Sequence, residues 1–217
     1  MNIRIPAIAA IGTLVALLLA TPALAARQPG AQAPDFTAEA SLAGKDFTFS
    51  LRKALAKGPV VVYFFPAAYT GGCDLEAHTF ATRKAGFVAA GATIIGVSAD
   101  SIQRLNKFSS DPDYCAGKFP VASDPDGKIA ATYGLKMIPP QKGVVDVLGK
   151  PVTHGFLPRT TFVIDRGGKI MAVLSSSADH LSPDQHVTKS LAIVRKLQAR
   201  AKPQPATRPA PATATRR

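Results

Sequence analysis

Apolar and β-branched runs alternate with helical patterns through the middle of the chain. The run Val60–Phe65, bounded by prolines, predicts a strand that is buried on both faces of a sheet. From Cys73 to about Ala90 the apolar positions have helical spacing, and Gly91 follows as a typical helix end. Ala92–Ser98 predicts a second buried strand. Strand, helix and strand without an intervening hairpin turn indicate a βαβ unit with parallel strands.

The second half of the chain predicts two short helices, a hairpin and a closing helix. Ser101–Phe108 and the region near Ile129–Tyr133 have helical patterns. The apolar runs Thr160–Ile164 and Lys169–Leu174 are joined by a Gly-rich link, which indicates a hairpin. Ser182–Gln185 has the capping-box pattern and opens a helix with one apolar side, made of Val187, Leu191, Val194 and Leu197. This order predicts an α/β protein with a thioredoxin-like fold, a central mixed β-sheet flanked by helices.

The N-terminal segment differs from the rest of the chain. A basic start at Arg4 is followed by an apolar run from about Ile5 to Ala20 and by the small-residue triplet Ala23–Ala25. This combination is typical of a secretory signal peptide, and we expect residues 1–25 to be removed during export to the periplasm. A permanent membrane anchor is the alternative. The apolar run is shorter than the ~20 residues needed to span a bilayer, and Pro22 interrupts a helix, so no stable membrane insertion is expected.

The C-terminal end carries much of the net charge of +12. From Ala201 to Arg217 it lacks large apolar side chains and predicts a disordered basic tail rich in Pro and Ala. Seven basic residues fall in the last 23 positions without aromatic residues that could stack on bases. We therefore expect a solvated tail and no nucleic-acid partner. Residues 26–200, about 175 in number, form one domain.

The sequence contains two cysteines, Cys73 and Cys115. In an oxidising compartment they could form a structural bridge, a redox pair, or a reactive thiol with a bystander. Too few Cys and His cluster at ligand spacing to indicate a metal site, and no cofactor is expected. The four histidines, which show no such spacing, are His78, His154, His180 and His186.

Cys73 follows a buried strand and two glycines and stands at the start of the predicted helix. Unpaired N–H groups and partial positive charge at a helix N-terminus favour thiolate over thiol. The Thr70 hydroxyl can bond to the sulfur or to an oxygen that arrives beside it, and Pro66 can shield the pocket from water. The alternative is a buried, inert cysteine. A Gly-rich turn between strand and helix suits that role poorly.

The segment Pro66–Cys73 has the form P-x-x-x-T-x-x-C and resembles the active-site loop of the peroxiredoxins. Ala33–Phe36 resembles the entry segment of that family, and Ile95–Asp100 resembles its second strand. Arg159–Asp165 resembles the strand that brings the family's active-site arginine to the sulfur. The resemblance extends from about Ala33 to Leu197.

This resemblance implies a thiol-dependent peroxidase that reduces hydrogen peroxide and organic hydroperoxides through a Cys73 sulfenic acid. Arg159, Thr70 and the Cys73 N–H would stabilise the charge that develops in the reaction, and Pro66 would line the pocket. Glu76 resembles the helix glutamate of the Q-type, bacterioferritin-comigratory-protein-like branch. As an acid in a first helical turn, it is explained equally well by the helix dipole. The implied partners are a peroxide and a thioredoxin-like or small-thiol reductant, and we expect a monomer or weak dimer.

Cys115 is the candidate resolving thiol. In many Q-type members that cysteine lies five residues after the first, a position that His78 occupies here. Tyr114–Pro120 resembles the arrangement of other members, which carry the resolving cysteine after the next helix. This implies a Cys73–Cys115 disulfide during turnover. The alternative is a free thiol at 115 and an outside reductant that clears the sulfenic acid.

Other thioredoxin-like activities fit the residues less well. An exported thiol–disulfide oxidoreductase needs C-x-x-C, but Thr70 and Glu76 flank Cys73 at that spacing. A copper chaperone of similar fold would need C-x-x-x-C, and position 77 is alanine. A non-catalytic binding module would have no need of Thr70, Cys73 and Arg159 together. The peroxidase interpretation uses all three.

Overall fold

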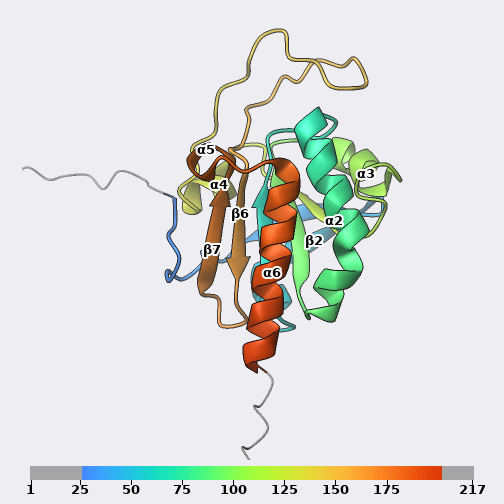
Figure 1. Ribbon diagram of the computed structural model, residues 1–217. Helices are drawn as coiled ribbons and strands as arrows, with labels where there is room; N and C mark the ends of the chain where they lie inside the picture. Colours follow the sequence, from blue (N-terminus) through green and yellow to red (C-terminus); the bar gives the residue numbers. More distant parts are fainter. Residues whose placement is uncertain (1–25, 202–217) are drawn as a thin grey trace, which may run out of the picture.

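The computed structural model describes residues 26–201, which form a seven-stranded sheet in the order β2-β1-β5-β4-β3-β6-β7 (Figure 1). β3 pairs in parallel with β4 and antiparallel with β6, so the sheet is mixed, as predicted. The strands are β1 (Thr37–Leu42), β2 (Lys45–Ser50), β3 (Val60–Phe64), β4 (Thr93–Ser98), β5 (Val121–Ser123), β6 (Thr160–Ile164) and β7 (Ile170–Ser175).

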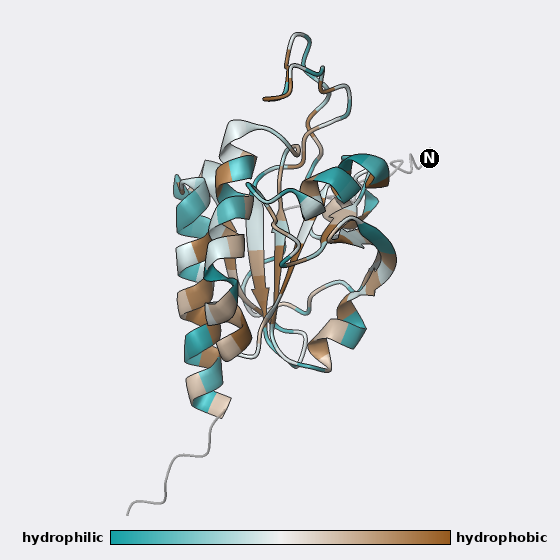
Figure 2. Ribbon diagram, turned by 90° about the vertical axis from the view of Figure 1, so that its right-hand side faces the viewer, coloured by the Kyte–Doolittle hydropathy of each residue, from teal (hydrophilic) through white to brown (hydrophobic). Residues whose placement is uncertain are grey.

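Helices cover both faces of the sheet. The helices are α1 (Leu51–Leu55), α2 (Gly71–Ala89), α3 (Ile102–Ser110), α4 (Lys128–Thr132), α5 (Ser176–Asp179) and α6 (Pro183–Ala201). α2 and α6 lie side by side across one face, and α3 packs into the same apolar cluster (Figure 1). α1 and α4 contribute to a second cluster on the opposite face. Hydrophobic and hydrophilic residues alternate along the helices, and the strands between them are coloured hydrophobic over much of their length (Figure 2).

β3 forms the centre of both apolar clusters, because all of its residues are buried. Val61 and Tyr63 point into the cluster beneath α2 and α6, whereas Val60, Val62 and Phe64 point into the other. This alternation is the physical reason for the uninterrupted apolar run in the sequence. β3 ends at Phe64, and the loop that leads to Cys73 follows directly.

Most of the predicted elements are confirmed to within a few residues. The predicted βαβ unit corresponds to β3, α2 and β4, and the hairpin to β6 and β7. At the closing helix the Ser182 N–H donates to Gln185 Oε1 at 3.0 Å, which is one arm of the expected capping box. The Ser182 hydroxyl instead donates to Asp184 Oδ1 at 2.6 Å.

Five short or exposed elements were not predicted from the sequence, namely β1, β2, β5, α1 and α5. The hairpin of β1 and β2 was not predicted: β2 is an edge strand whose residues are mostly exposed, so its apolar pattern is weak. β5 has three residues, and α1 and α5 have five and four. Elements this short carry too little periodicity to be recognised from sequence.

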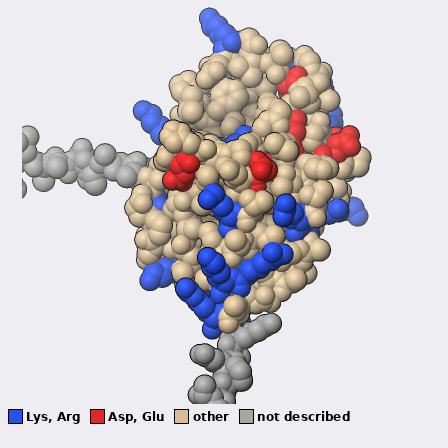
Figure 3. All heavy atoms as spheres, in the orientation of Figure 1, with Lys and Arg blue, Asp and Glu red and all other residues tan. Residues whose placement is uncertain are grey.

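The two ends of the chain bear on the domain predictions. The predicted signal peptide, residues 1–25, lies outside the described residues, as does 202–217 of the predicted tail. Ala201, expected to begin the tail, is the last residue of α6. Among residues 26–201, no helix is both long and apolar enough to cross a membrane. On the face drawn in Figure 3, basic side chains gather over the lower part of α2 and α6.

Candidate active site

Cys73 lies in the first turn of α2, at the end of the loop that follows β3. The N–H groups of Cys73 and Asp74 donate to the Thr70 carbonyl oxygen at 2.7 and 3.0 Å, which closes the turn. Cys73 thus stands at the helix N-terminus, as predicted. Its N–H, expected to be a free donor for the reaction, is already paired with Thr70 in this structure.

Arg159 reaches this turn from a distant part of the chain. It directly precedes β6, and the antiparallel register pairs Thr160 with Phe64, so Arg159 lies beside the loop that leaves β3. Its Nη2 donates to the Cys73 sulfur at 3.2 Å, and its Nη1 forms an ion pair with Glu76 Oε2. The structure therefore brings together Cys73, Glu76 and Arg159.

Glu76 is not the helix-surface acid that the dipole explanation would require. Its side chain is fully buried beside Arg159, which is itself 11% exposed. Burial raises the pKa of Glu76 to about 7, and Arg159 opposes this rise. Oε1 of Glu76 has no hydrogen-bond partner among the described residues. The glutamate therefore fixes the position of the guanidinium and keeps one acceptor free at the site.

Opposing effects act on the Cys73 thiol. Burial raises its pKa, and the Glu76 carboxylate adds to the rise. Arg159, the main chain of Ala67 and the Thr70 hydroxyl lower the pKa. The partial positive charge of the α2 N-terminus acts in the same lowering direction. The thiolate is favoured by this group of donors and disfavoured by the exclusion of water.

Thr70 and Pro66 shape the loop around the sulfur. The Thr70 hydroxyl donates to the Ala67 carbonyl oxygen at 2.7 Å and so bridges the loop on itself. Between them, Tyr69 adopts a left-handed backbone conformation with φ of 60°. Pro66 is half-buried at the end of β3. Of the residues predicted from the loop motif, Thr70 thus lies beside Cys73, and Pro66 belongs to the loop that leads to it.

A buried histidine, His186, is linked to the main chain of Arg159 through Ser176. The Arg159 carbonyl oxygen accepts from the Ser176 N–H at 3.2 Å. His186 lies between the hydroxyls of Thr161 and Ser176, with a hydrogen bond of 3.0 Å to each. Burial, followed by the charge of Arg159, lowers the pKa of His186 to about 4. No spacing in the sequence marked this residue, because its partners come from β6 and α5.

Cys115 lies in the turns between α3 and β5 and is fully buried. Burial raises its pKa well above the ordinary value, and Asp111 and Asp74 add to the rise. Cys73 and Cys115 are both free thiols and belong to the same apolar cluster. The arrangement is that of the reduced protein.

His78 contacts the segment that carries Cys115. Its Nδ1 lies 2.9 Å from the carbonyl oxygen of Asp113. Many Q-type members are expected to carry the resolving cysteine at the position of His78. In this chain, His78 contacts the segment that holds Cys115, the other candidate position for that cysteine.

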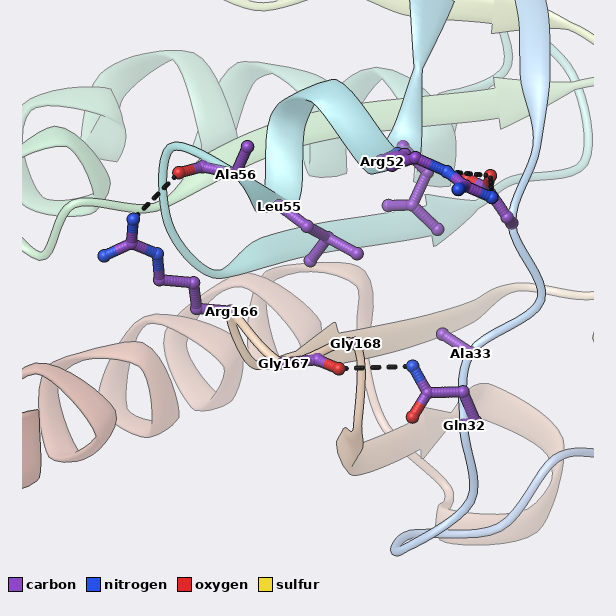
Figure 4. A pocket seen from close by; sticks show the side chains of 10 residues that line it. Gln32, Ala33, Arg52, Leu55, Ala56, Arg166, Gly167 and Gly168 are labelled. Atoms are coloured by element: carbon purple, nitrogen blue, oxygen red, sulfur yellow. Dashed lines mark hydrogen bonds and ion pairs between the residues drawn. The ribbon is translucent and has the colours of Figure 1, made fainter.

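A pocket of about 370 Å³ lies away from Cys73, between the N-terminal segment, α1 and the link of the β6–β7 hairpin (Figure 4). Its polar groups are already paired: Gln32 donates to Gly167, Arg166 donates to Ala56, and Arg52 forms an ion pair with Asp35. It contains neither cysteine. Within residues 26–201, no group of three or more His, Cys, Asp or Glu side chains could hold a metal ion.

Comparison with known proteins identifies the family. A model of the AhpC/TSA family matches residues 29–173. The chain belongs to the AhpC/TSA family. A Mycobacterium tuberculosis protein that carries the name peroxiredoxin is 35% identical over 145 residues, 67% of this chain and 83% of that protein. Chloroplastic peroxiredoxin Q of Sedum lineare is 30% identical over 150 residues, 69% of each chain.

Solved peroxiredoxin structures share the fold. Peroxidoxin BcpB of Mycobacterium tuberculosis superposes with a TM-score of 0.63 at 31% identity, covering 78% of this chain and 97% of that one. The bacterioferritin comigratory protein of Xanthomonas campestris gives a TM-score of 0.57 at 25% identity, covering 80% and 98%. The predicted thioredoxin-like fold is confirmed. This peroxiredoxin is a thiol-dependent peroxidase, whose substrate is a peroxide and whose reductant is thioredoxin-like.

The neutral state of His186 predicts a pH-dependent stability. The folded protein keeps its pKa near 4, whereas the unfolded chain has the ordinary value of 6.5. Between these values the unfolded state takes up the proton, so stability is complete above about pH 6.5 and declines as the pH falls toward 4. At pH 4 we expect the loss to reach about 3 kcal/mol. Urea unfolding from pH 7.5 to 4 measures it, and His186→Asn should flatten the dependence; an unchanged slope would contradict the assignment.

Proposed function

We propose that Cys73 is the sulfur that attacks the peroxide and that Arg159, Thr70, Glu76 and Pro66 form its pocket. The observation that carries this proposal is the 3.2 Å contact between Arg159 Nη2 and the Cys73 sulfur at the start of α2. A guanidinium in this position stabilises the thiolate and the charge that moves to the leaving oxygen. Glu76 orients the guanidinium, and Thr70 supplies a hydroxyl beside the sulfur.

In the reaction, the Cys73 thiolate attacks one oxygen of the peroxide. A sulfur–oxygen bond forms, the oxygen–oxygen bond breaks, and the sulfur is oxidised by two electrons to a sulfenic acid. The other oxygen leaves with the electron pair of the broken bond and takes up a proton, as water from hydrogen peroxide or as an alcohol from an organic hydroperoxide. Arg159 lies beside the sulfur, and there it can stabilise the negative charge as it moves from the sulfur to the leaving oxygen, so its stabilisation is greater in the transition state than before it.

Removal of the guanidinium tests this assignment. Arg159→Met should lower kcat/KM for hydrogen peroxide by about 10²- to 10³-fold and raise the pKa of Cys73, because a preorganised donor and a positive charge are lost. Peroxide consumption with a dithiol reductant and the pH dependence of thiol alkylation provide the two readouts. Arg166→Met, at the opposite end of β6, is the matched control and should behave as wild type. Cys73→Ser should be inactive; full activity would refute the central assignment.

We propose further that Cys115 resolves the sulfenic acid. Its thiolate would attack the Cys73 sulfur, a disulfide would form, and the sulfenic oxygen would leave as water; an external dithiol would then return both sulfurs to thiols. Because Cys115 is fully buried, its segment must loosen for this step. Ala116 supports such loosening, since its φ of 51° is a costly conformation for a residue with a side chain.

One equivalent of hydrogen peroxide should therefore yield an intramolecular Cys73–Cys115 disulfide in the monomer. Cys115→Ser should still form the first sulfenic acid at an unchanged rate, since the Cys73 pocket is intact, but should over-oxidise to the sulfinic acid under excess peroxide. Non-reducing mass spectrometry distinguishes the products. Mixed or intermolecular disulfides alone would point to an outside reductant and eliminate the resolving role.

The segment before the domain supports export. We propose that residues 1–25 are cleaved as a signal peptide, that the mature peroxidase acts in the periplasm as a monomer or weak dimer, and that residues 202–217 form a basic tail. N-terminal sequencing of the protein from the cell envelope should begin near Ala26. Recovery of intact Met1 from the soluble cytoplasm would overturn the proposal.

A further inference from the structure

Four charged or titratable side chains outside the catalytic set gather beneath the Cys73 loop. Asp100 follows β4, Arg104 lies on α3, and Asp146 and His154 belong to the long segment between α4 and β6. That segment, residues 138–156, extends from one end of the domain and is called the arm here (Figure 1). The side chains of Asp100 and Asp146 are fully buried, and those of Arg104 and His154 are 20% and 22% exposed.

These side chains hold both main-chain polar groups of Ala68. The Ala68 N–H donates to Asp100 Oδ2 at 2.8 Å, and its carbonyl oxygen accepts from Arg104 Nη2 at 2.8 Å. Arg104 also pairs with Asp100 at 2.9 Å and with Asp146 at 2.7 Å, and His154 Nε2 lies 2.9 Å from Asp100 Oδ1. We call these four side chains the loop clamp.

The loop clamp combines acidic and basic groups. Two carboxylates face one guanidinium and one histidine, and the hydrogen bond and charge of Asp100 raise the pKa of His154 against the effect of burial and of Arg104. Asp146 is further satisfied through Oδ1 by the N–H groups of Leu148 and Lys150. A buried charge cluster of this kind is stable when every member is paired and costly when one partner is removed.

Tyr69 connects the clamp to the segment of the second cysteine. Its carbonyl oxygen accepts from the Val147 N–H of the arm at 2.9 Å. The Arg104 guanidinium lies 5.1 Å from the centre of its ring. The same ring packs edge-on against Tyr114 at 5.3 Å, and Tyr114 directly precedes Cys115. Opening of the loop at Tyr69 therefore removes a contact that also holds the Cys115 segment in place.

We propose that Arg104 and Asp146 are positioning residues of the peroxidase, which hold the Cys73 loop in its reactive shape and oppose its opening toward Cys115. Within the described residues, neither makes a polar contact with the Cys73 sulfur or with Arg159; they act through Ala68 and Tyr69. The clamp thereby sets the partition of the Cys73 sulfenic acid between disulfide formation, which requires opening, and over-oxidation, which occurs in the closed pocket. That partition rests on the proposed resolving role of Cys115.

Asp146→Asn tests the proposal with little change in shape, because an amide oxygen can still accept from Leu148 and Lys150. Hydrogen exchange at the main-chain N–H groups of residues 67–73, followed by mass spectrometry, should accelerate roughly tenfold, the equivalent of about 1.4 kcal/mol. With excess peroxide the sulfinic fraction should fall relative to the disulfide. The first sulfenic acid should form within about twofold of the wild-type rate, because the closed loop remains the main population.

Two further variants keep the result interpretable. Asp126→Asn is the control variant: it removes an exposed ion pair with Lys128 that shares no residue with the loop clamp. It should leave unchanged both the hydrogen exchange of residues 67–73 and the ratio of sulfinic acid to disulfide. Arg104→Lys keeps the positive charge but cannot make all the contacts of the guanidinium, so it should accelerate hydrogen exchange in residues 67–73 by less than tenfold. It also serves as the test variant if Asp146→Asn does not fold. A role in stability alone would lower the melting temperature of Asp146→Asn without selective exchange in residues 67–73.

The proposal is overturned if Asp146→Asn and Arg104→Lys both keep wild-type exchange in this loop. Its failure is separable from failure of the resolving role. In a Cys115→Ser background no internal disulfide can form, yet the loop clamp still predicts faster exchange for Asp146→Asn. Absence of the disulfide in wild type, with exchange behaving as expected, would reject Cys115 as the resolving thiol and retain the loop clamp.

Discussion

The ion pair between Arg159 and Glu76, buried against the Cys73 sulfur, is the interaction on which the rest of the site depends. Neither charge is stable in an apolar interior by itself, and each would leave the other unpaired if removed. The pair therefore persists only while β6 and α2 keep their positions. Since β6 is hydrogen-bonded to β3, the sheet itself delivers the guanidinium to the helix that carries the cysteine.

Exclusion of water from the pocket has two opposite consequences for the reaction of Cys73. It raises the pKa of Cys73 and so disfavours the nucleophile, but it also strengthens every charge interaction in the pocket. Arg159, Thr70 and the helix N-terminus act against the first effect and benefit from the second. A site of this design is most effective when the peroxide is enclosed with the sulfur, because the charge then moves between groups that are already fixed.

The need to enclose the sulfur conflicts with the need to resolve it. Cys73 and Cys115 are both buried in the reduced protein, and the strained residues Tyr69 and Ala116 stand next to the two cysteine segments. Left-handed backbone at residues with side chains stores energy that local opening releases. The polar contacts around Ala68 oppose that release. Closed and open arrangements are thus balanced by backbone strain on one side and buried charge pairs on the other.

The sequence by itself determined the local features of this protein. The apolar run of β3, the glycines before Cys73 and the periodicity of α2 are properties of consecutive residues, so they specify a strand, a turn and a helix whose first turn holds the cysteine. Tertiary structure decided which distant residues complete the site. Arg159 contacts a sulfur 86 positions away, and this contact follows from the register of β3 and β6. Resemblance to a family motif pointed to Arg159, but no pattern marked the pairing of Arg104 with Asp146, because burial and pairing of charges arise only when separate elements pack together.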